Sequence, residues 1–142
     1  MNPHGLPVWR SMLFVPVHVE RFVAKAADCG ADAIILDLED AVPPAEKPRA
    51  RGLVRAAAAE VSRCGADVLV RINRPLREAL ADLEAVIGIC VAALMLPKVA
   101  GPENVRLLAE AIEEIERERG RRLGVTRLVA MVETADAYFK MQ

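Results

Sequence analysis

The stretch IILDLEDAVP, residues 34–43, places three acidic residues directly behind a run of branched apolar residues. The apolar run predicts a buried strand, so Asp37, Glu39 and Asp40 lie at or just beyond the end of that strand. One interpretation is that the acids form the turn that returns the strand to water. The other is that they form a carboxylate cluster that holds a metal ion or a proton in an enzyme. Evidence from the rest of the sequence is needed to choose between these two interpretations.

Five short apolar runs recur along the chain, and none of them alternates strictly between apolar and polar residues. This pattern is typical of parallel strands that are covered on both faces. The predicted strands are 12–16, 33–36, 68–72, 92–96 and 127–132. Helical patterns lie between them, over 20–27, 46–62, 78–86 and 102–119. The alternation predicts an α/β fold with a parallel sheet and right-handed crossovers.

Polar side chains gather after the predicted strands rather than before them. Arg71 and Asn73 end the third strand. Lys98 follows the fourth strand, and Glu133 follows the fifth. The carboxyl ends of parallel strands form the edge at which ligands bind in barrels and open α/β sheets. The acids of residues 34–43 belong to the same edge, which favours the chemical interpretation.

Bulk properties exclude several classes of protein. The chain has 142 residues, a formal net charge of −1 and no basic stripe, so it lacks the footprint of a nucleic-acid-binding protein. No apolar run reaches the roughly 18 residues of a membrane span, and the first residues lack a basic-then-apolar signal pattern. We therefore expect a cytoplasmic protein that binds neither nucleic acid nor membrane.

The cysteine and histidine patterns do not indicate a metal site. Cys29, Cys64 and Cys90 are odd in number and lack CxxC spacing. We expect free, buried thiols, with a metal-binding or nucleophilic role as the minority alternative. His4 and His18 show no ligand spacing and receive no assignment.

Five motifs in register resemble one known family. They are RSMLFVP (10–16), GADAIILDLEDAV (30–42), VRIN (70–73), MLPKV (95–99) and MVET (131–134). In this order and approximate spacing they resemble the citrate lyase β-subunit-like group of the HpcH/HpaI aldolase superfamily, which includes citryl-, malyl- and citramalyl-CoA lyases. The resemblance implies a (β/α)₈ TIM barrel. It also implies a Mg²⁺-dependent enzyme that cleaves or forms a carbon–carbon bond between an acetyl thioester and a 2-oxo acid.

The resemblance implies roles for individual residues. Arg71 matches the arginine that grips a substrate carboxylate, and Glu133 matches the first Mg²⁺ ligand, which also meets the substrate. Glu39 and Asp40 match an acidic pair near the water shell of the metal. Lys98 is either a substrate-side lysine or a solvated one. The chemistry suits these residue types, because a guanidinium fits a carboxylate through two hydrogen bonds and Mg²⁺ takes few carboxylates while keeping several waters.

Each role has a structural alternative. Arg71 could be a salt-bridged arginine at a strand end, because an unpaired charge there would be costly. Glu133 could be an acid that favours the start of a helix. Asp37 is interpreted as structural, bonding the backbone amides of its loop. The loops VPVHVERF (15–22) and RPLREALADL (74–83) depart from the family pattern, and both would lie over the mouth of the site.

Length is the larger departure from the family. A full barrel needs about 250 residues, so 142 residues provide roughly the first five strands. We expect one partial barrel domain over 1–142, with 1–9 as an N-terminal extension, and the second metal ligand of the family, an aspartate, beyond residue 142. Residues 1–142 alone are expected to bind Mg²⁺ no tighter than about millimolar, to show no turnover and to self-associate through open strand edges. We also expect a homo-oligomer.

Three functions are consistent with the sequence. The first is a carbon–carbon lyase that acts on the CoA thioester of a hydroxy-dicarboxylic or hydroxy-tricarboxylic acid, with an acyl-CoA thioester and a 2-oxo acid as its ligands. The second is a CoA-independent aldolase that forms pyruvate. The third is a non-catalytic assembly partner within a lyase complex. The combination of DLED with VRIN favours the first function.

Overall fold

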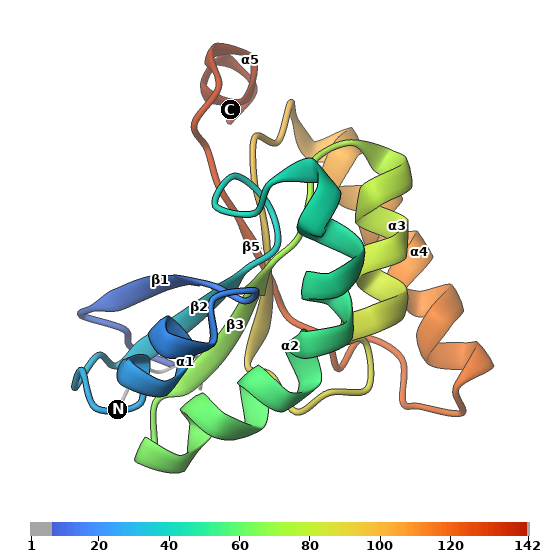
Figure 1. Ribbon diagram of the computed structural model, residues 1–142. Coiled ribbons are helices and arrows are strands. Elements are labelled where there is room, and N and C mark those ends of the chain that lie inside the picture. The colour runs from blue at the N-terminus through green and yellow to red at the C-terminus, as the bar shows by residue number, and fades with distance from the viewer. Residues whose placement is uncertain (1–6, 142) are drawn as a thin grey trace.

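A five-stranded parallel sheet forms the frame of the molecule (Figure 1). The computed structural model describes residues 7–141. The strands lie side by side in chain order and are β1 (Met12–Pro16), β2 (Ala33–Asp37), β3 (Asp67–Arg71), β4 (Ala93–Leu96) and β5 (Leu128–Ala130). The predicted α/β class and the five predicted strands are confirmed, with boundaries that differ by at most two residues.

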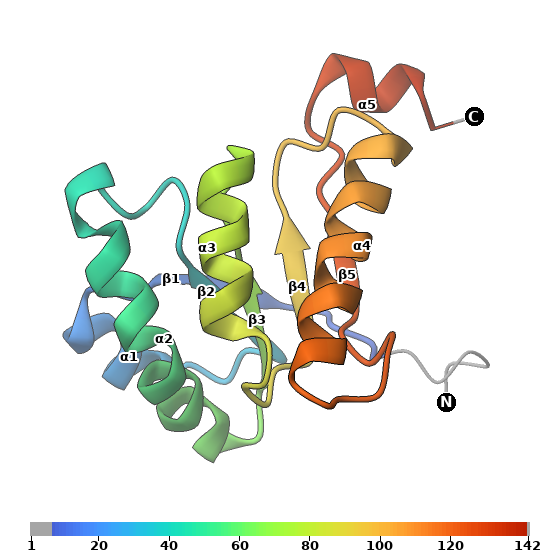
Figure 2. The same cartoon turned by 90° about the vertical axis from the view of Figure 1, so that its right-hand side faces the viewer.

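Four helices cover one face of this sheet, and a fifth stands apart (Figure 2). The helices are α1 (Glu20–Ala26), α2 (Lys47–Val61), α3 (Leu76–Val86), α4 (Pro102–Glu118) and α5 (Ala135–Phe139), with short 3₁₀ turns at η1 (Pro44–Glu46) and η2 (Ser62–Cys64). Pro102 in the first turn of α4 supplies a preset backbone angle where no N–H is needed. Each helix of the covering layer connects two neighbouring parallel strands, as the alternation predicted.

The two faces of the sheet carry two different cores. Alternate strand residues such as Ile34, Leu36 and Val70 pack against the helices. The intervening residues form a smaller cluster on the opposite, inner face, made of Ala33, Ile35, Leu69, Ala93 and Met95 with Trp9, Val129 and Met131 packed against it. Because strand side chains alternate with a period of two, the next inner-facing positions of β2 and β3 are Asp37 and Arg71. The sheet therefore presents these two charged residues together at its carboxyl edge.

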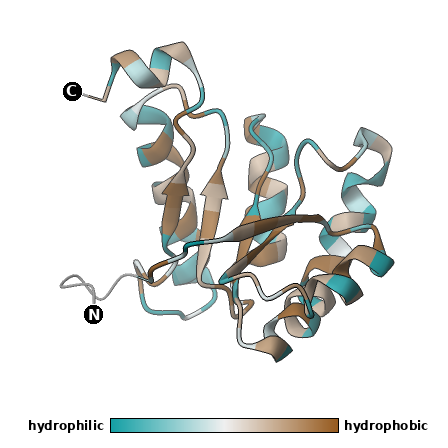
Figure 3. Ribbon diagram, turned by 90° about the vertical axis from the view of Figure 1, so that its left-hand side faces the viewer, coloured by the Kyte–Doolittle hydropathy of each residue, from teal (hydrophilic) through white to brown (hydrophobic). Residues whose placement is uncertain are grey.

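The sheet is open, and its two outer strands are less covered than its central ones. All five residues of β2 are buried, whereas Met12, Leu13 and Phe14 of β1 are 37%, 38% and 43% exposed. Figure 3 shows β1 as an apolar strand with no helix in front of it. Cover on both faces is thus confirmed for β2 to β4 and wrong for β1 and β5. The reason is that each outer strand has one neighbour, so the barrel is not closed.

The predicted burial of the cysteines is wrong. Cys29, Cys64 and Cys90 are free, as expected, but all three are exposed. Each lies in a connection that leads from a helix to the next strand, and these turns run over the surface. Nowhere in residues 7–141 is a helix both long and apolar enough to span a bilayer. His4 and most of the predicted N-terminal extension lie outside the described residues.

Candidate active site at the carboxyl edge of the sheet

An ion pair between β2 and β3 forms the floor of the site. Asp37 and Arg71 are direct neighbours in the parallel register. Arg71 donates from Nε to Asp37 Oδ1 over 2.8 Å and from Nη2 to Oδ2 over 2.6 Å. The two side chains are 12% (Arg71) and 0% (Asp37) exposed. This pair is a forked, desolvated contact of the strongest type.

Asp37 also organises the acidic loop that follows it. Its Oδ1 accepts the backbone N–H of Glu39 over 2.9 Å, and its Oδ2 accepts that of Ala41 over 3.0 Å. The structural role predicted for Asp37 is confirmed. Burial by itself raises the pKa of Asp37, but the hydrogen bonds from Arg71 and from the loop amides outweigh burial and lower it.

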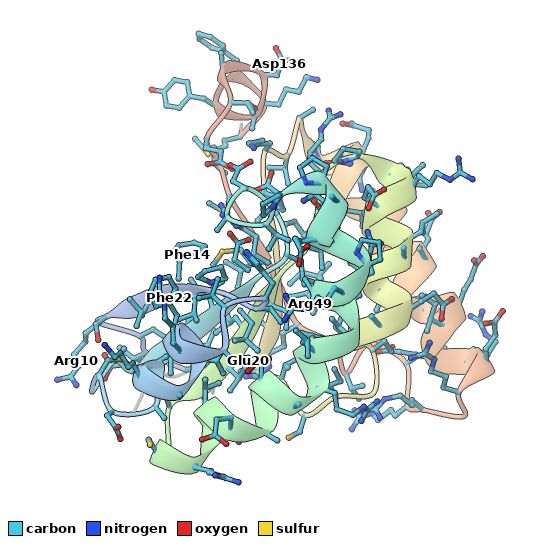
Figure 4. All side chains as sticks on the ribbon, viewed as in Figure 1. Arg10, Phe14, Glu20, Phe22, Arg49 and Asp136 are labelled. Atoms are coloured by element: carbon cyan, nitrogen blue, oxygen red, sulfur yellow. The ribbon has the colours of Figure 1, made fainter. Side chains whose placement is uncertain are left out.

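Arg71 already uses Nε and Nη2 to bind Asp37, so these two donors are not free to bind a ligand. Its guanidinium also lies 4.7 Å from the centre of the ring of Phe14, which stands out from β1 (Figure 4). Only Nη1 is left, and it lies 3.3 Å from Glu39 Oε2. The salt-bridged alternative therefore describes the arginine in this structure, and its contact with a substrate carboxylate stays a prediction.

Lys98 connects acids from two separate strands. Its ammonium Nζ lies 2.7 Å from Glu39 Oε1 and 2.8 and 2.9 Å from the two carboxylate oxygens of Asp40. Its backbone N–H donates to Glu133 Oε1 over 2.8 Å. These hydrogen bonds raise the pKa of Lys98, and that of Asp40 is lowered mainly by the same contact. Glu39, Asp40 and Glu133, hereafter the three-acid group, thus converge on one residue.

Glu133 is not the acid that starts the last helix. Helix α5 is capped by Thr134, whose hydroxyl accepts the N–H of Ala137 over 3.1 Å. The acid in its first turn is Asp136, which lies out on α5 (Figure 4). Glu133 instead follows β5 as an exposed side chain at the mouth of the site. The structure therefore leaves its carboxylate available for the metal-binding role that the family resemblance implies.

A second network, behind the acidic loop, was not predicted from the sequence. Lys47 Nζ donates to the carbonyls of Leu38 and Glu39 over 3.0 and 2.9 Å, and also bonds Asn73 Oδ1. Asn73 donates to the Leu38 carbonyl over 2.9 Å and to the fully buried Asp82 over 2.7 Å. Asn73 is visible in VRIN, but the other two occupy ordinary helical positions that no pattern marks. This network fixes the backbone that presents Glu39.

The carboxylate oxygens at the edge are the type of ligand that a hard divalent cation prefers. Glu39 is 5% exposed, and its Oε2 is buried without a hydrogen bond. Four carboxylates face two cationic side chains, which leaves two negative charges in excess; the members are Asp37, Glu39, Asp40, Glu133, Arg71 and Lys98. Within residues 7–141 no three His, Cys, Asp or Glu side chains stand close enough to hold a metal ion by themselves. An ion such as Mg²⁺, which keeps several waters and uses one or two carboxylates, still fits these donors.

A parallel α/β sheet with charged residues gathered at its carboxyl edge places the chain among the α/β folds, barrels and open sheets alike, in which ligands bind at that edge. The comparison with known families is specific: the HpcH/HpaI aldolase/citrate lyase family matches residues 10–142. The chain belongs to this family. Among curated proteins, it is 37% identical over 129 residues to citrate lyase subunit beta of Leuconostoc mesenteroides subsp. cremoris, which covers 89% of this chain and 42% of that protein. It is 35% identical over 133 residues to a (3S)-malyl-CoA thioesterase of Cereibacter sphaeroides, covering 93% and 43%.

Solved structures agree with this assignment. A citrate lyase beta subunit from M. tuberculosis, complexed with oxaloacetate and magnesium, is 34% identical and superposes with a TM-score of 0.62, covering 88% of this chain and 48% of that one. The malate synthase of Haloferax volcanii has a TM-score of 0.82 at 16% identity, covering 94% and 44%, and supports the barrel-type fold alone. The chain therefore spans less than half the length of each of these four relatives.

Proposed function

We propose that the chain supplies the first part of the active site of a Mg²⁺-dependent carbon–carbon lyase. The proposed substrate is a CoA thioester of a hydroxy-dicarboxylic or hydroxy-tricarboxylic acid, such as citryl-, malyl- or citramalyl-CoA. The products are an acetyl thioester and a 2-oxo acid. The observation that carries the proposal is the convergence of Glu39, Asp40 and Glu133 at one carboxyl edge, where the buried Glu39 Oε2 accepts no hydrogen bond and has only the ion-pair contact with Arg71 Nη1 at 3.3 Å.

The residues at the edge have distinct proposed tasks. Glu133 would bind the cation directly, and Glu39 and Asp40 would hold its waters. When bound, the cation would polarise the carbonyl of the 2-oxo acid as a Lewis acid. Arg71, fixed by Asp37, would place a positive charge beside the substrate carboxylate through Nη1. That contact uses one edge of the guanidinium, so it would be weaker than the two-bond grip expected from the sequence.

Thioester hydrolysis is the second candidate function. The relative from Cereibacter sphaeroides is named a (3S)-malyl-CoA thioesterase, and its identity of 35% is close to the 37% of the citrate lyase subunit. The same carboxyl edge would then position a water against the thioester carbonyl. The products differ: hydrolysis releases a free hydroxy acid and a thiol, whereas the lyase reaction releases a 2-oxo acid and keeps the thioester.

One product assay separates these functions. Malyl-, citramalyl- and citryl-CoA are incubated with the longest product of this reading frame and, in parallel, with residues 1–142. A 2-oxo acid without free thiol supports the lyase, and thiol without a 2-oxo acid supports the thioesterase. If pyruvate forms only from a CoA-free hydroxy-oxo acid, the CoA-independent aldolase function replaces both the lyase and the thioesterase. If none of these substrates reacts and the chain co-purifies with other lyase subunits, an assembly role replaces catalysis.

A further inference from the structure

Lys98 occupies a position that the proposed function does not explain. It is the single non-glycine residue with a positive φ within residues 7–141, at φ 49°. A left-handed backbone is unfavourable for a lysine and persists only where surrounding contacts enforce it. Here the backbone N–H of Lys98 bonds Glu133, and its side chain reaches the acids that follow β2. The unusual conformation therefore lets one residue contact the whole three-acid group.

The ammonium of Lys98 is fully used by carboxylates. A lysine has three N–H donors. Nζ lies within 2.9 Å of three carboxylate oxygens, one from Glu39 and two from Asp40. The substrate-side role considered from the sequence would require these bonds to break. In this arrangement the ammonium partly neutralises the acids and has no free N–H donor for a ligand.

From this geometry we propose that Lys98 is a built-in monovalent competitor for the divalent-cation site. Its ammonium occupies the carboxylates that a divalent cation would otherwise attract, and so it holds the affinity of the chain for the cation low. The inference rests on the proposed cation site and adds a residue that tunes it. A low affinity would let the ion arrive together with a chelating acid instead of remaining fixed in the protein.

The two cationic side chains differ in how firmly their contacts hold them in the site. Arg71 is 12% exposed and is tied to Asp37 by two hydrogen bonds, so it cannot leave the site without stranding a buried carboxylate. Lys98 is 42% exposed and pairs with Asp40, which is 61% exposed. The lysine is therefore the cation that can withdraw into water when a divalent ion approaches.

Direct titration with Mn²⁺ tests the inference on residues 1–142. Mn²⁺ shares the preference of Mg²⁺ for oxygen ligands, and its free concentration is read by electron paramagnetic resonance. Lys98→Asn removes the charge and tolerates a left-handed backbone, and Lys98→Gly removes the charge together with the strain. Lys98→Arg keeps the charge and is the matched control. We expect both neutral variants to bind Mn²⁺ about tenfold more tightly than the wild type, or about 1.4 kcal/mol, and the arginine variant to stay near the wild type.

Equal or weaker Mn²⁺ binding by the neutral variants would overturn the inference. If Lys98→Asn fails to fold, as judged by circular dichroism, the glycine variant decides the outcome. Glu133→Gln in the same titration separates this inference from the proposed function, because Glu133 is the proposed direct ligand. No loss of binding in Glu133→Gln would remove the cation site itself, whereas a loss there without a gain in the Lys98 variants would remove only the role of Lys98.

Discussion

Removal of the Arg71 guanidinium should destabilise the fold far more than removal of an arginine with the same bonding pattern at the surface. Arg71→Met keeps most of the apolar stem and strands Asp37, whose side chain is 0% exposed. Breaking one side of a buried pair costs about 3–5 kcal/mol, and we place this case at about 3 kcal/mol because Asp37 keeps its two backbone bonds. A domain of this size has about 5–15 kcal/mol in total, so the loss is large.

Arg10 provides the matched control. It binds Asp32 with the same fork, through Nη2 at 2.8 Å and Nε at 3.1 Å, but it is 83% exposed and points outward (Figure 4). Exposed pairs contribute little, because water and salt screen them. We therefore expect Arg10→Met to unfold with the wild-type midpoint.

Urea unfolding followed by circular dichroism, at one protein concentration, measures both variants. With a denaturant slope of about 1.5 kcal/mol per molar, Arg71→Met should lower the midpoint by about 2 M. The double variant Asp37→Asn/Arg71→Met should recover part of this loss, because no unpaired charge remains. Equal midpoints for Arg71→Met and Arg10→Met would refute the description of Asp37 and Arg71 as a desolvated pair.

Because the pKa of Asp37 is lowered by folding, its contribution is present above about pH 4 and is lost as the pH falls through its folded value, so acid should destabilise the wild type more steeply than Asp37→Asn in a urea series. Glu116→Gln should cost about 1–3 kcal/mol and speed hydrogen exchange in the loop before β5, because the buried carboxylate accepts from Gly124 and Thr126; unchanged exchange would contradict this role. The apolar outer strand β1 should cause self-association of residues 1–142 in sedimentation, and Leu13→Lys should weaken it; a monomeric wild type would contradict this expectation.

The fold was predictable because its signal is local. Runs such as 34–36 are short, branched and apolar, and each is followed by a helical pattern, so strand and helix types follow from periodicity. The exposure of β1 was not predictable in this way. A strand of the same composition is buried or exposed according to whether another strand lies beside it, and that depends on partners that its own residues do not specify.

The gathering of charged residues at the carboxyl edge was predictable, but their pairings were not. The sequence placed Arg71, Glu39 and Glu133 at one edge, and the structure brings them there. It could not show that Asp37 takes the fork of Arg71, because the pair depends on the register between two strands separated by a helix. The position of Lys98 depends on a left-handed backbone. In a sequence, that conformation is indicated by glycine and, less strongly, by asparagine or aspartate, but not by lysine.

The location of a bound divalent cation decides whether the carboxyl edge is the proposed cation site. Amide signals of the isotope-labelled chain are recorded while Mn²⁺ is added in substoichiometric amounts, because a nearby paramagnetic ion broadens them. The first signals to disappear should belong to Glu39, Asp40, Lys98 and Glu133, and Glu133→Gln should restore them. Broadening that begins instead along the glutamate-rich surface of α4, with the carboxyl edge unaffected, would contradict the claim that this edge is a cation-dependent active site.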